Sequence, residues 1–555
     1  MTAFNYRKYP AFAFAPQMKH RQWPNEVMTK APRWCSVDLR DGNQALIDPM
    51  NIQQKKRFWK TLVDIGFKEI ESGFPSASQT EFDFHRALVD EQLIPDDVTI
   101  QVLVQAREHL IERTFEALKG VKRAIVHVYN STSRVQRNKV FGKSRQDIKA
   151  IAVSGAELVK RYAAQYPQTE WVFQYSPESF SQTEPDFAVE VVEAVCRVWQ
   201  PENGQQVIIN LPATVEAAMP NVYADQVEYF CTNFPSRQDV TISLHTHNDR
   251  GCAVAAAEMG VLAGADRIEG TLFGNGERTG NMDIVAMAMN LYSQGIDPEL
   301  DFSDMTGIVQ TVTECTNLPI HPRHPWVGEL VFTAFSGSHQ DAIKKSLEKS
   351  SDGVWDIAYL PIDPKDIGRT YQDVVRINSQ SGKGGVAYVL QRDYSIDLPR
   401  WMQIDFSRLV QKRSEDTERE LSTDEIWTLF QQAYMELETP YQLKQFNKLT
   451  REDEQDHIIA TLVTNQGEEI VEGVGEGTLT SFIRAMEHHI GKNIRVLNYA
   501  EHALSEGTRA EAMAYVQVGM EGMVHSGVAR SHDTVTAMLR ATMTAINAAL
   551  RSTDN

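Results

Sequence analysis

The chain has 555 residues, which is too long for one small hydrophobic core and predicts several domains. Hydrophobic residues make up 42% and charged residues 23% of the chain, as is usual for soluble globular proteins. The 55 basic against 74 acidic residues give a formal charge of −19, which argues against a general binder of nucleic acid or of anionic membranes.

The N-terminal residues 1–30 are expected to form an arm that contacts a neighbouring surface or, in a homodimer, the partner subunit. This arm lacks the apolar core of a secretory signal. Nowhere do about 18 apolar residues run together, so no membrane span is expected. The five cysteines are scattered without a C-x-x-C pair, which favours a reduced, cytoplasmic location.

Residues 31–320 alternate short apolar segments with amphipathic segments, a pattern that predicts a parallel sheet covered by helices. The expected strands are 33–40, 68–73, 98–105, 123–129, 170–175, 206–211, 240–247 and 266–273, and the expected helices are 51–65, 78–92, 107–119, 144–165, 184–199, 221–233, 252–263 and 282–294. Eight such units predict a TIM (β/α)8 barrel. A doubly wound sheet would want a glycine-rich dinucleotide turn after the first strand, which residues 38–44 do not supply.

A pair of histidines stands at the end of the seventh expected strand. His245 and His247 are two residues apart, so on a strand their imidazoles point to the same face and can bind one ion. Such a pair needs oxygen ligands to complete a Mg, Mn or Zn site. Asp41 after the first strand and Asn281 at the end of the glycine-dense loop 274–281 can supply them. An ordinary polar strand end without an ion is the alternative.

Other polar residues stand where expected strands end, which is the face of a barrel where chemistry takes place. Arg40 offers a fork of donors to a ligand carbonyl or carboxylate, although pairing with Asp41 at the barrel mouth is the more common fate of such neighbours. Glu178 can act as a general base, with a surface carboxylate as the alternative. His127 and Thr214 end two further strands.

Residues 321–437 have a mixed pattern and are expected to form small linker subdomains, ending in a charged helix over 411–437. His339 and Tyr371 lie in this region, where a structural role is the more frequent one. Residues 438–555 contain an internal duplication, because 473–485 aligns with 527–541 and each copy follows an alternating strand (458–463 and 512–518) and leads into a long helix. Two such units predict a pseudo-symmetric α/β module, which would serve equally well as a ligand sensor or for dimerisation.

Three motifs together resemble the signatures of the Claisen-condensing acyltransferases: Asp38–Gln44, His245–Asp249 and Gly274–Asn281. In that family they lie on the first strand, on the seventh strand and in the loop after the eighth, in this order. Within the family, the chain is most similar to the 2-isopropylmalate synthases of the longer type, which have an N-terminal arm and a leucine-sensing C-terminal domain. The likeness covers nearly the whole chain, and segments 332–342 and 361–371 extend it into the linker region.

The resemblance implies a role for each candidate residue. A divalent metal, Mg²⁺ ahead of Mn²⁺ or Zn²⁺, would be held by Asp41, His245, His247 and Asn281, and a monovalent cation such as K⁺ could serve as an activator. Arg40 would polarise the substrate carbonyl, and His127, Ser176 and Thr214 would line the pocket for a 2-oxo acid. Glu178 with His339 would form the acid–base pair, assisted by Tyr371, and His339 and Tyr371 would come from the partner subunit of a homodimer.

The implied activity is the condensation of acetyl-CoA with 3-methyl-2-oxobutanoate and water to (2S)-2-isopropylmalate and CoA. This is the first committed step of leucine biosynthesis, and leucine would inhibit it through residues 438–555. Citramalate synthase, homocitrate synthase or a lyase that runs a related cleavage is the alternative within the family. A metal-dependent hydrolase is the alternative outside it, but in those barrels the paired histidines belong to the first strand and not the seventh.

Overall fold

A computed structural model describes residues 5–200, 207–350, 353–370, 383–417, 421–435, 437–450, 455–504 and 510–553. Contacts between residues divide the chain into two compact units. The first contains residues 1–331 with 364–369, and the second contains 332–363 with 370–555. Among the helices of these described ranges, none combines the length and the apolar character that crossing a bilayer requires.

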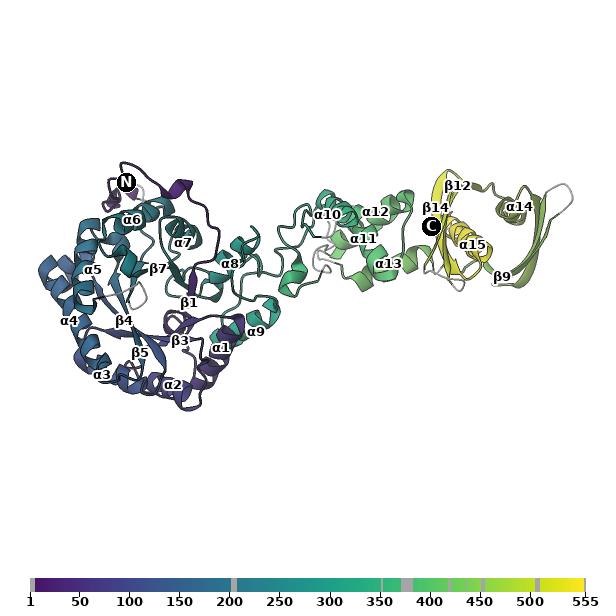
Figure 1. Cartoon of the computed structure of the whole chain (residues 1–555). Helices are drawn as coiled ribbons and strands as arrows, with labels where there is room; N and C mark the ends of the chain where they lie inside the picture. Colours follow the sequence, from purple (N-terminus) through teal and green to yellow (C-terminus); the bar gives the residue numbers. More distant parts are fainter. Residues whose placement is uncertain are drawn as a thin grey trace. The chain divides into compact units, whose positions relative to one another are not determined.

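Eight parallel strands close into a barrel in the first unit, as the sequence predicts (Figure 1). They are β1 (Arg33–Ser36), β2 (Glu69–Gly73), β3 (Thr99–Gln105), β4 (Arg123–Ser131), β5 (Glu170–Glu178), β6 (Val207–Ala213), β7 (Thr241–Thr246) and β8 (Arg267–Gly270). Each strand pairs with its neighbours in sequence, and β8 closes the barrel on β1. Helices cover the outside and side chains fill the inside, so most strand residues are buried and the strands are recognised as apolar segments.

The outer helices follow the strands in alternation. They are α1 (Ile52–Ile65), α2 (Gln79–Asp90), α3 (Glu108–Ala117), α4 (Arg145–Ala163), α5 (Pro185–Trp199), α6 (Pro220–Asn233), α7 (Ala253–Leu262), α8 (Ile284–Tyr292) and α9 (Met305–Thr316). Local sequence explains several of their starts: Asn51 begins α1 and Ser144 begins α4 with a capping box, and proline stands at the first position of α5 and α6.

The first strand ends four residues earlier than expected. Beyond Ser36 the chain enters a π-helical turn, Asp38–Gly42, which a contact distant in sequence stabilises. The buried carboxylate of Asp38 accepts hydrogen bonds from the backbone nitrogen of Leu272 (3.0 Å) and from Ser36 Oγ (2.7 Å). This turn places Arg40 and Asp41 at the carboxyl end of the barrel.

The second unit begins with four helices, α10 (Gly337–Lys349), α11 (Lys383–Tyr394), α12 (Arg400–Thr417) and α13 (Thr423–Tyr434). The prediction of one helix over 411–437 is wrong, because α12 and α13 are separate helices. Ser422 and Glu425 form a capping box that starts α13, and this local signal marks the new helix within the charged segment.

The C-terminal duplication folds into two antiparallel three-stranded sheets, each with one helix (Figure 1). Strands β9 (Gln442–Thr450), β10 (Asp456–Thr464) and β11 (Gly467–Gly475) precede α14 (Thr478–Ile490), and β12 (Arg495–Ala503), β13 (Ala512–Met520) and β14 (Met523–Ser531) precede α15 (Thr534–Thr553). The predicted α/β module is therefore confirmed. The one strand predicted in each copy is the central one, β10 or β13, and the two outer strands of each sheet are additions to it. Side chains of both copies share one hydrophobic core.

The two copies use glycine in the same way. A Cβ atom on Gly473 would lie 2.3 Å from the carbonyl oxygen of Ser481, and a Cβ atom on Gly527 would lie 2.2 Å from that of Ala541. Glycine is therefore needed at both places for the strand to pack directly on the helix of its own copy.

Candidate active site

A cavity of about 290 Å³ lies at the carboxyl ends of the barrel strands. Most of the candidate residues line it: Arg40, Asp41, His127, Ser176, Glu178, Thr214, His245 and His247. The side chains of Phe74, Leu103 and Pro212 supply an apolar part of the wall. The cavity therefore combines a polar floor with room for a small alkyl group.

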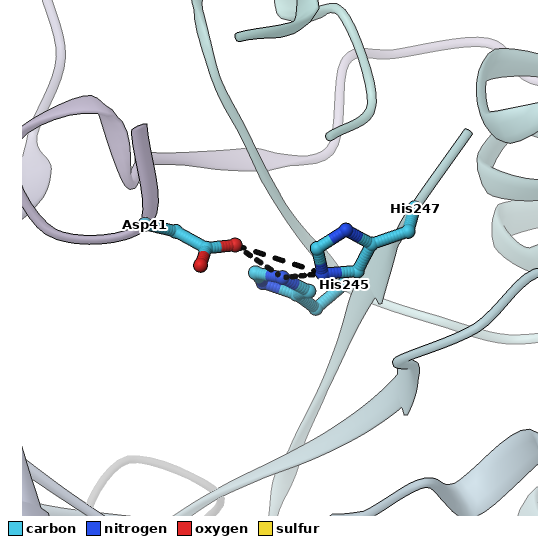
Figure 2. A group of neighbouring side chains, drawn as sticks. All are labelled: Asp41, His245 and His247. Atoms are coloured by element: carbon cyan, nitrogen blue, oxygen red, sulfur yellow. Dashed lines mark hydrogen bonds and ion pairs between the residues drawn. The ribbon is translucent and has the colours of Figure 1, made fainter. Parts of the chain in front are cut away.

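Asp41, His245 and His247 converge on one point of this cavity (Figure 2). Asp41 Oδ2 lies 3.2 Å from His245 Nε2 and 3.6 Å from His247 Nε2, and the two Nε2 atoms are 3.3 Å apart. A carboxylate oxygen and two imidazole lone pairs this close repel one another unless a proton or a cation lies between them. The three groups are therefore placed so that they could hold a metal ion.

A buried carboxylate on the Nδ1 side of the ring, opposite the other two residues of the cluster, fixes the orientation of His245. Its Nδ1 lies 3.0 Å from Glu269 Oε2, and because a carboxylate only accepts, Nδ1 carries the hydrogen and Nε2 is left to bind an ion. Burial opposes a charged imidazole, but hydrogen bonds with Asp41 and Glu269 raise the pKa of His245 to about 9. Without an ion, Nε2 therefore also carries a hydrogen, and a metal that binds there would displace it. Burial and the neighbouring His245 lower the pKa of His247 to about 3.

The acidity of Asp41 also suits a cation site. Burial disfavours its charged form, yet the positive charge of Arg40 and the contact with His245 outweigh this and hold the pKa of Asp41 well below its usual value. Arg40 Nη1 lies 2.9 Å from Asp41 Oδ1, while Oδ2 faces the imidazoles. Asp41 is therefore a carboxylate at any physiological pH.

Asn281 lies beside these residues because it forms a β-bridge with His247. Its Nδ2 donates to the carbonyl oxygen of Asn275 (3.0 Å), whereas its Oδ1 is buried and accepts no hydrogen bond from the described part of the chain. The loop can fold back this closely because Gly280 has a φ of +96°, and a Cβ there would lie 1.8 Å from the carbonyl oxygen of Gly274. One carboxylate, two imidazoles and an unpaired amide oxygen fit a divalent metal.

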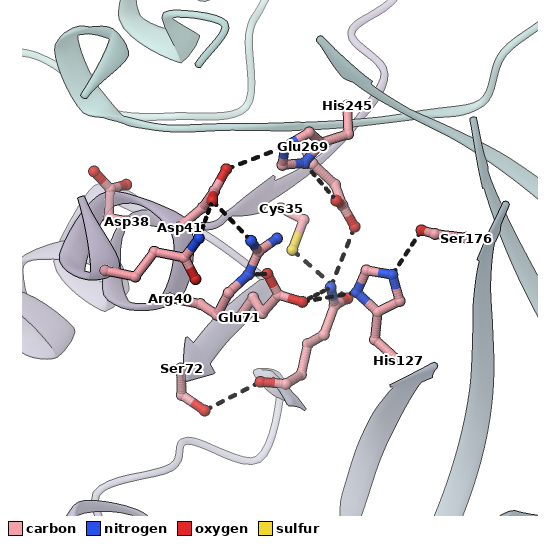
Figure 3. A network of polar contacts seen from close by, with 12 residues as sticks. Cys35, Asp38, Arg40, Asp41, Glu71, Ser72, His127, Ser176, His245 and Glu269 are labelled. Atoms are coloured by element: carbon pink, nitrogen blue, oxygen red, sulfur yellow. Dashed lines mark hydrogen bonds and ion pairs between the residues drawn. The ribbon is translucent and has the colours of Figure 1, made fainter. Parts of the chain in front are cut away.

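A chain of buried contacts leads from Arg40 into the rest of the cavity (Figure 3). Arg40 Nε donates to Glu71, and Glu71 Oε1 in turn accepts from His127 Nδ1 at 2.8 Å. This leaves His127 Nε2 as an acceptor for the hydroxyl of Ser176, at 2.7 Å. In each hydrogen bond along this side of the cavity, it is therefore defined which residue donates and which accepts.

Two further candidates stand at the rim. Glu178 ends β5, is half-buried, and accepts a hydrogen bond from Ser131 Oγ. Thr214 Oγ1 accepts from the backbone nitrogen of Ser179 at 2.9 Å, so its own hydroxyl hydrogen remains available for a ligand.

His339, one of the two remaining candidates, belongs to the second unit. His339 lies in the first turn of α10, and its ring stacks on that of Tyr359 with centroids 4.1 Å apart. Tyr371 lies outside the described residues. The functional roles of both stay predictions.

Sequence reasoning missed Asn210 and Glu269, which connect the histidines with the serine of the pocket. Both lie within strands, β6 and β8, and are almost fully buried. For Asn210 the available signal was an amide side chain inside an otherwise apolar strand, since such a group is buried only with partners. For Glu269 it was a carboxylate two residues after Arg267 on a short strand.

Comparison with known proteins relates the whole chain to one family. Residues 31–312 match the family model described as HMGL-like, residues 329–391 that of the alpha-isopropylmalate synthase post-catalytic domain, and residues 420–550 that of the LeuA allosteric (dimerisation) domain. A 2-isopropylmalate synthase of Clostridium acetobutylicum is 51% identical over 98% of this chain and 98% of its own length. That of Alcanivorax borkumensis is 54% identical over 98% of this chain and 97% of its own.

Proposed function

The chain belongs to the 2-isopropylmalate synthase family, and we propose that it condenses acetyl-CoA with 3-methyl-2-oxobutanoate and water to give (2S)-2-isopropylmalate and CoA. It would thus be an acyltransferase that converts the acyl group into an alkyl group on transfer. The observation that carries this proposal is the convergence of Asp41, His245 and His247 in a cavity that also holds Arg40 and Glu178.

Asp41, His245, His247 and Asn281 would hold the divalent metal, with Mg²⁺ as the first choice and Mn²⁺ or Zn²⁺ as alternatives. When bound, such an ion supplies Lewis-acid polarisation of the 2-oxo group and takes up negative charge on its oxygen. A monovalent cation such as K⁺ would act as an activator. Arg40, held by Asp41 and Glu71, would donate to the same carbonyl oxygen.

His127, Ser176 and Thr214 would line the pocket for the 2-oxo acid. Thr214 has a hydroxyl hydrogen available for the substrate carboxylate, because its oxygen already accepts from the Ser179 backbone. The branched alkyl group would pack on the apolar wall formed by Phe74, Leu103 and Pro212. This division between a polar floor and an apolar wall suits 3-methyl-2-oxobutanoate.

Glu178 would act as the general base. The methyl group of an acetyl thioester is a weak acid, so the base must stand close to it and the resulting carbanion must be used at once. After losing its proton to Glu178, the methyl carbon would attack the keto carbon of the 2-oxo acid. The keto oxygen would take up a proton from the Glu178–His339 pair and become the hydroxyl of a tertiary alcohol. Hydrolysis of the thioester would then release CoA and draw the reaction to completion. His339 would pair with Glu178 in the proton transfers and Tyr371 would assist, both from the partner subunit.

The domain roles follow from the same family membership. Residues 31–320 would form the catalytic domain, 321–437 the linker subdomains and 438–555 the regulatory domain. Leucine would bind the regulatory domain and inhibit the enzyme, and the match to a LeuA allosteric (dimerisation) model supports this. The enzyme would be a cytoplasmic homodimer in which the arm 1–30 contacts the partner.

A thiol-release assay with acetyl-CoA and a panel of 2-oxo acids, with and without leucine, tests the proposal. We expect the highest kcat/KM with 3-methyl-2-oxobutanoate and inhibition by leucine. A preference for pyruvate or for 2-oxoglutarate would instead assign the citramalate or the homocitrate reaction. No thiol release with any 2-oxo acid would contradict the condensation itself.

A further inference from the structure

Glu269 stands where the histidines meet the pocket for the 2-oxo acid. Its Oε2 accepts from His245 Nδ1 at 3.0 Å and from Asn210 Nδ2 at 3.3 Å. The same Nδ2 donates to Ser176 Oγ at 3.0 Å. We infer that Glu269 is a positioning residue that sets both the tautomer of His245 and the orientation of Asn210. This inference rests on the proposed function and deepens it.

The contacts of Glu269 close a ring around the cavity floor. Figure 3 shows the part of it that contains Ser176, His127, Glu71, Arg40, Asp41, His245 and Glu269. In order, the ring runs through Asp41, Arg40, Glu71, His127, Ser176, Asn210, Glu269 and His245 and returns to Asp41. Gln101 Nε2 joins the two carboxylates across the ring, at 2.9 Å from Glu71 and 3.2 Å from Glu269. Metal ligands and pocket residues thus share one buried network, in which a misplaced donor affects its neighbours.

The groups around Glu269 require a hydrogen-bond acceptor at each of its two carboxylate oxygens. Its Oε1 accepts from Arg267 Nη1 (2.8 Å), Gln174 Nε2 (2.6 Å) and Gln101 Nε2 (3.2 Å), while Oε2 accepts from His245 and Asn210. A glutamine at this place has one acceptor and one donor, so one side must fail. Arg267 is buried and always charged, and it will therefore keep the amide oxygen.

The amide NH2 of a glutamine would consequently face His245 and Asn210. To accept from it, His245 would have to carry its hydrogen on Nε2, and Nε2 would then lose the lone pair that faces Asp41. The NH2 group of Asn210 would meet a second NH2 group and would have to turn away from Ser176. One isosteric change would thus weaken metal binding without touching a metal ligand.

The test is a titration of the metal-free full-length chain with Mn²⁺, followed by electron paramagnetic resonance. For E269Q we expect the Mn²⁺ Kd to rise by about 10- to 100-fold, as for other residues that orient a metal-bound histidine. E69Q is the matched control, because Glu69 also accepts from the buried Arg267 but, among the described residues, its hydrogen bonds go to Arg267 and Arg33 and not to the ring. Its Kd should stay within about twofold of wild type. An unchanged Kd in E269Q, or an equal rise in E69Q, would overturn the inference.

E269D provides a second measurement if E269Q fails to fold. It keeps the charge and both acceptors but withdraws the carboxylate by one methylene group, so the Kd should rise by a smaller factor than in E269Q. A Kd unchanged in E269D would overturn the inference. H247A distinguishes a failure of this inference from a failure of the proposed function. If wild type and H247A bind Mn²⁺ equally well, the metal site itself is refuted, and the inference with it.

Discussion

Replacing Asp41 with asparagine removes one negative charge from the cation site and leaves the shape of the side chain unchanged. In the structure, Asp41 Oδ2 lies 3.2 and 3.6 Å from the two imidazoles, so an ion among them would be within about 4 Å of the carboxylate. At an effective dielectric constant near 20, the attraction between a divalent ion and a carboxylate at this distance is roughly 8 kcal/mol.

The loss of water from the ion and its repulsion by the nearby guanidinium of Arg40 absorb much of this attraction. We therefore expect D41N to weaken metal binding by about 3 kcal/mol, which is roughly 100-fold in Kd. The barrel should remain folded, because Arg40 keeps its contact with Glu71. Calorimetric titration of the metal-free chain with Mn²⁺ measures the change in Kd, and circular dichroism measures the melting temperature.

D225N is the control for this experiment. Asp225 is buried to a similar degree and also pairs with an arginine, Arg21, but it lies on α6 and contacts no imidazole. Its Mn²⁺ Kd should equal that of wild type. A folded D41N chain that binds Mn²⁺ within threefold of wild type would refute the electrostatic reasoning.

Three other predictions follow from the same structure. E178Q should lower kcat in the thiol-release assay by about 10²- to 10³-fold with little change in KM for the 2-oxo acid; a kcat close to wild type would remove Glu178 as the base. Burial lowers the pKa of His85 from 6.5 to about 3. Below pH 6.5 the unfolded chain therefore gains a proton at this residue that the folded barrel does not gain. The free energy of unfolding consequently falls as the pH drops from 6.5 towards 3. H85N should therefore reduce the change in the urea midpoint between pH 7 and pH 4.5, and an unreduced change would contradict this cause. Leucine should slow hydrogen exchange in β9–β14, α14 and α15 of the full-length chain; slowing confined to the barrel would place the effector in the cavity instead.

The barrel could be predicted from sequence because most of its strands are apolar segments and several of its helices begin with a local signal. The end of β1 could not, since the turn after it depends on Asp38 accepting from Leu272, far along the chain. The break between α12 and α13 was missed although Ser422 and Glu425 encode it locally. The whole segment is rich in charged residues, and its composition therefore predicts one continuous helix in spite of the capping box.

For the site, the alternation of strand side chains places His245 and His247 on one face, as their spacing predicts. Asn210 and Glu269 escaped notice because their contacts join different strands inside the barrel, and no local pattern encodes such contacts. The roles given to His339 and Tyr371 rest on resemblance alone, because His339 lies in the second unit and Tyr371 lies outside the described residues. Sequence periodicity thus identifies residues that share an element more readily than residues that share a contact.

The central claim is that an ion held by Asp41, His245 and His247 binds the 2-oxo acid. Paramagnetic resonance of the Mn²⁺-loaded chain with 3-methyl-2-oxobutanoate labelled with ¹⁷O at its keto oxygen measures this contact directly. We expect the Mn²⁺ lines of the wild-type chain to be broader with the labelled substrate than with the unlabelled one. In H247A, we expect the same line width with both substrates. Identical spectra for both substrates in the wild-type chain, at saturating concentration, would contradict it.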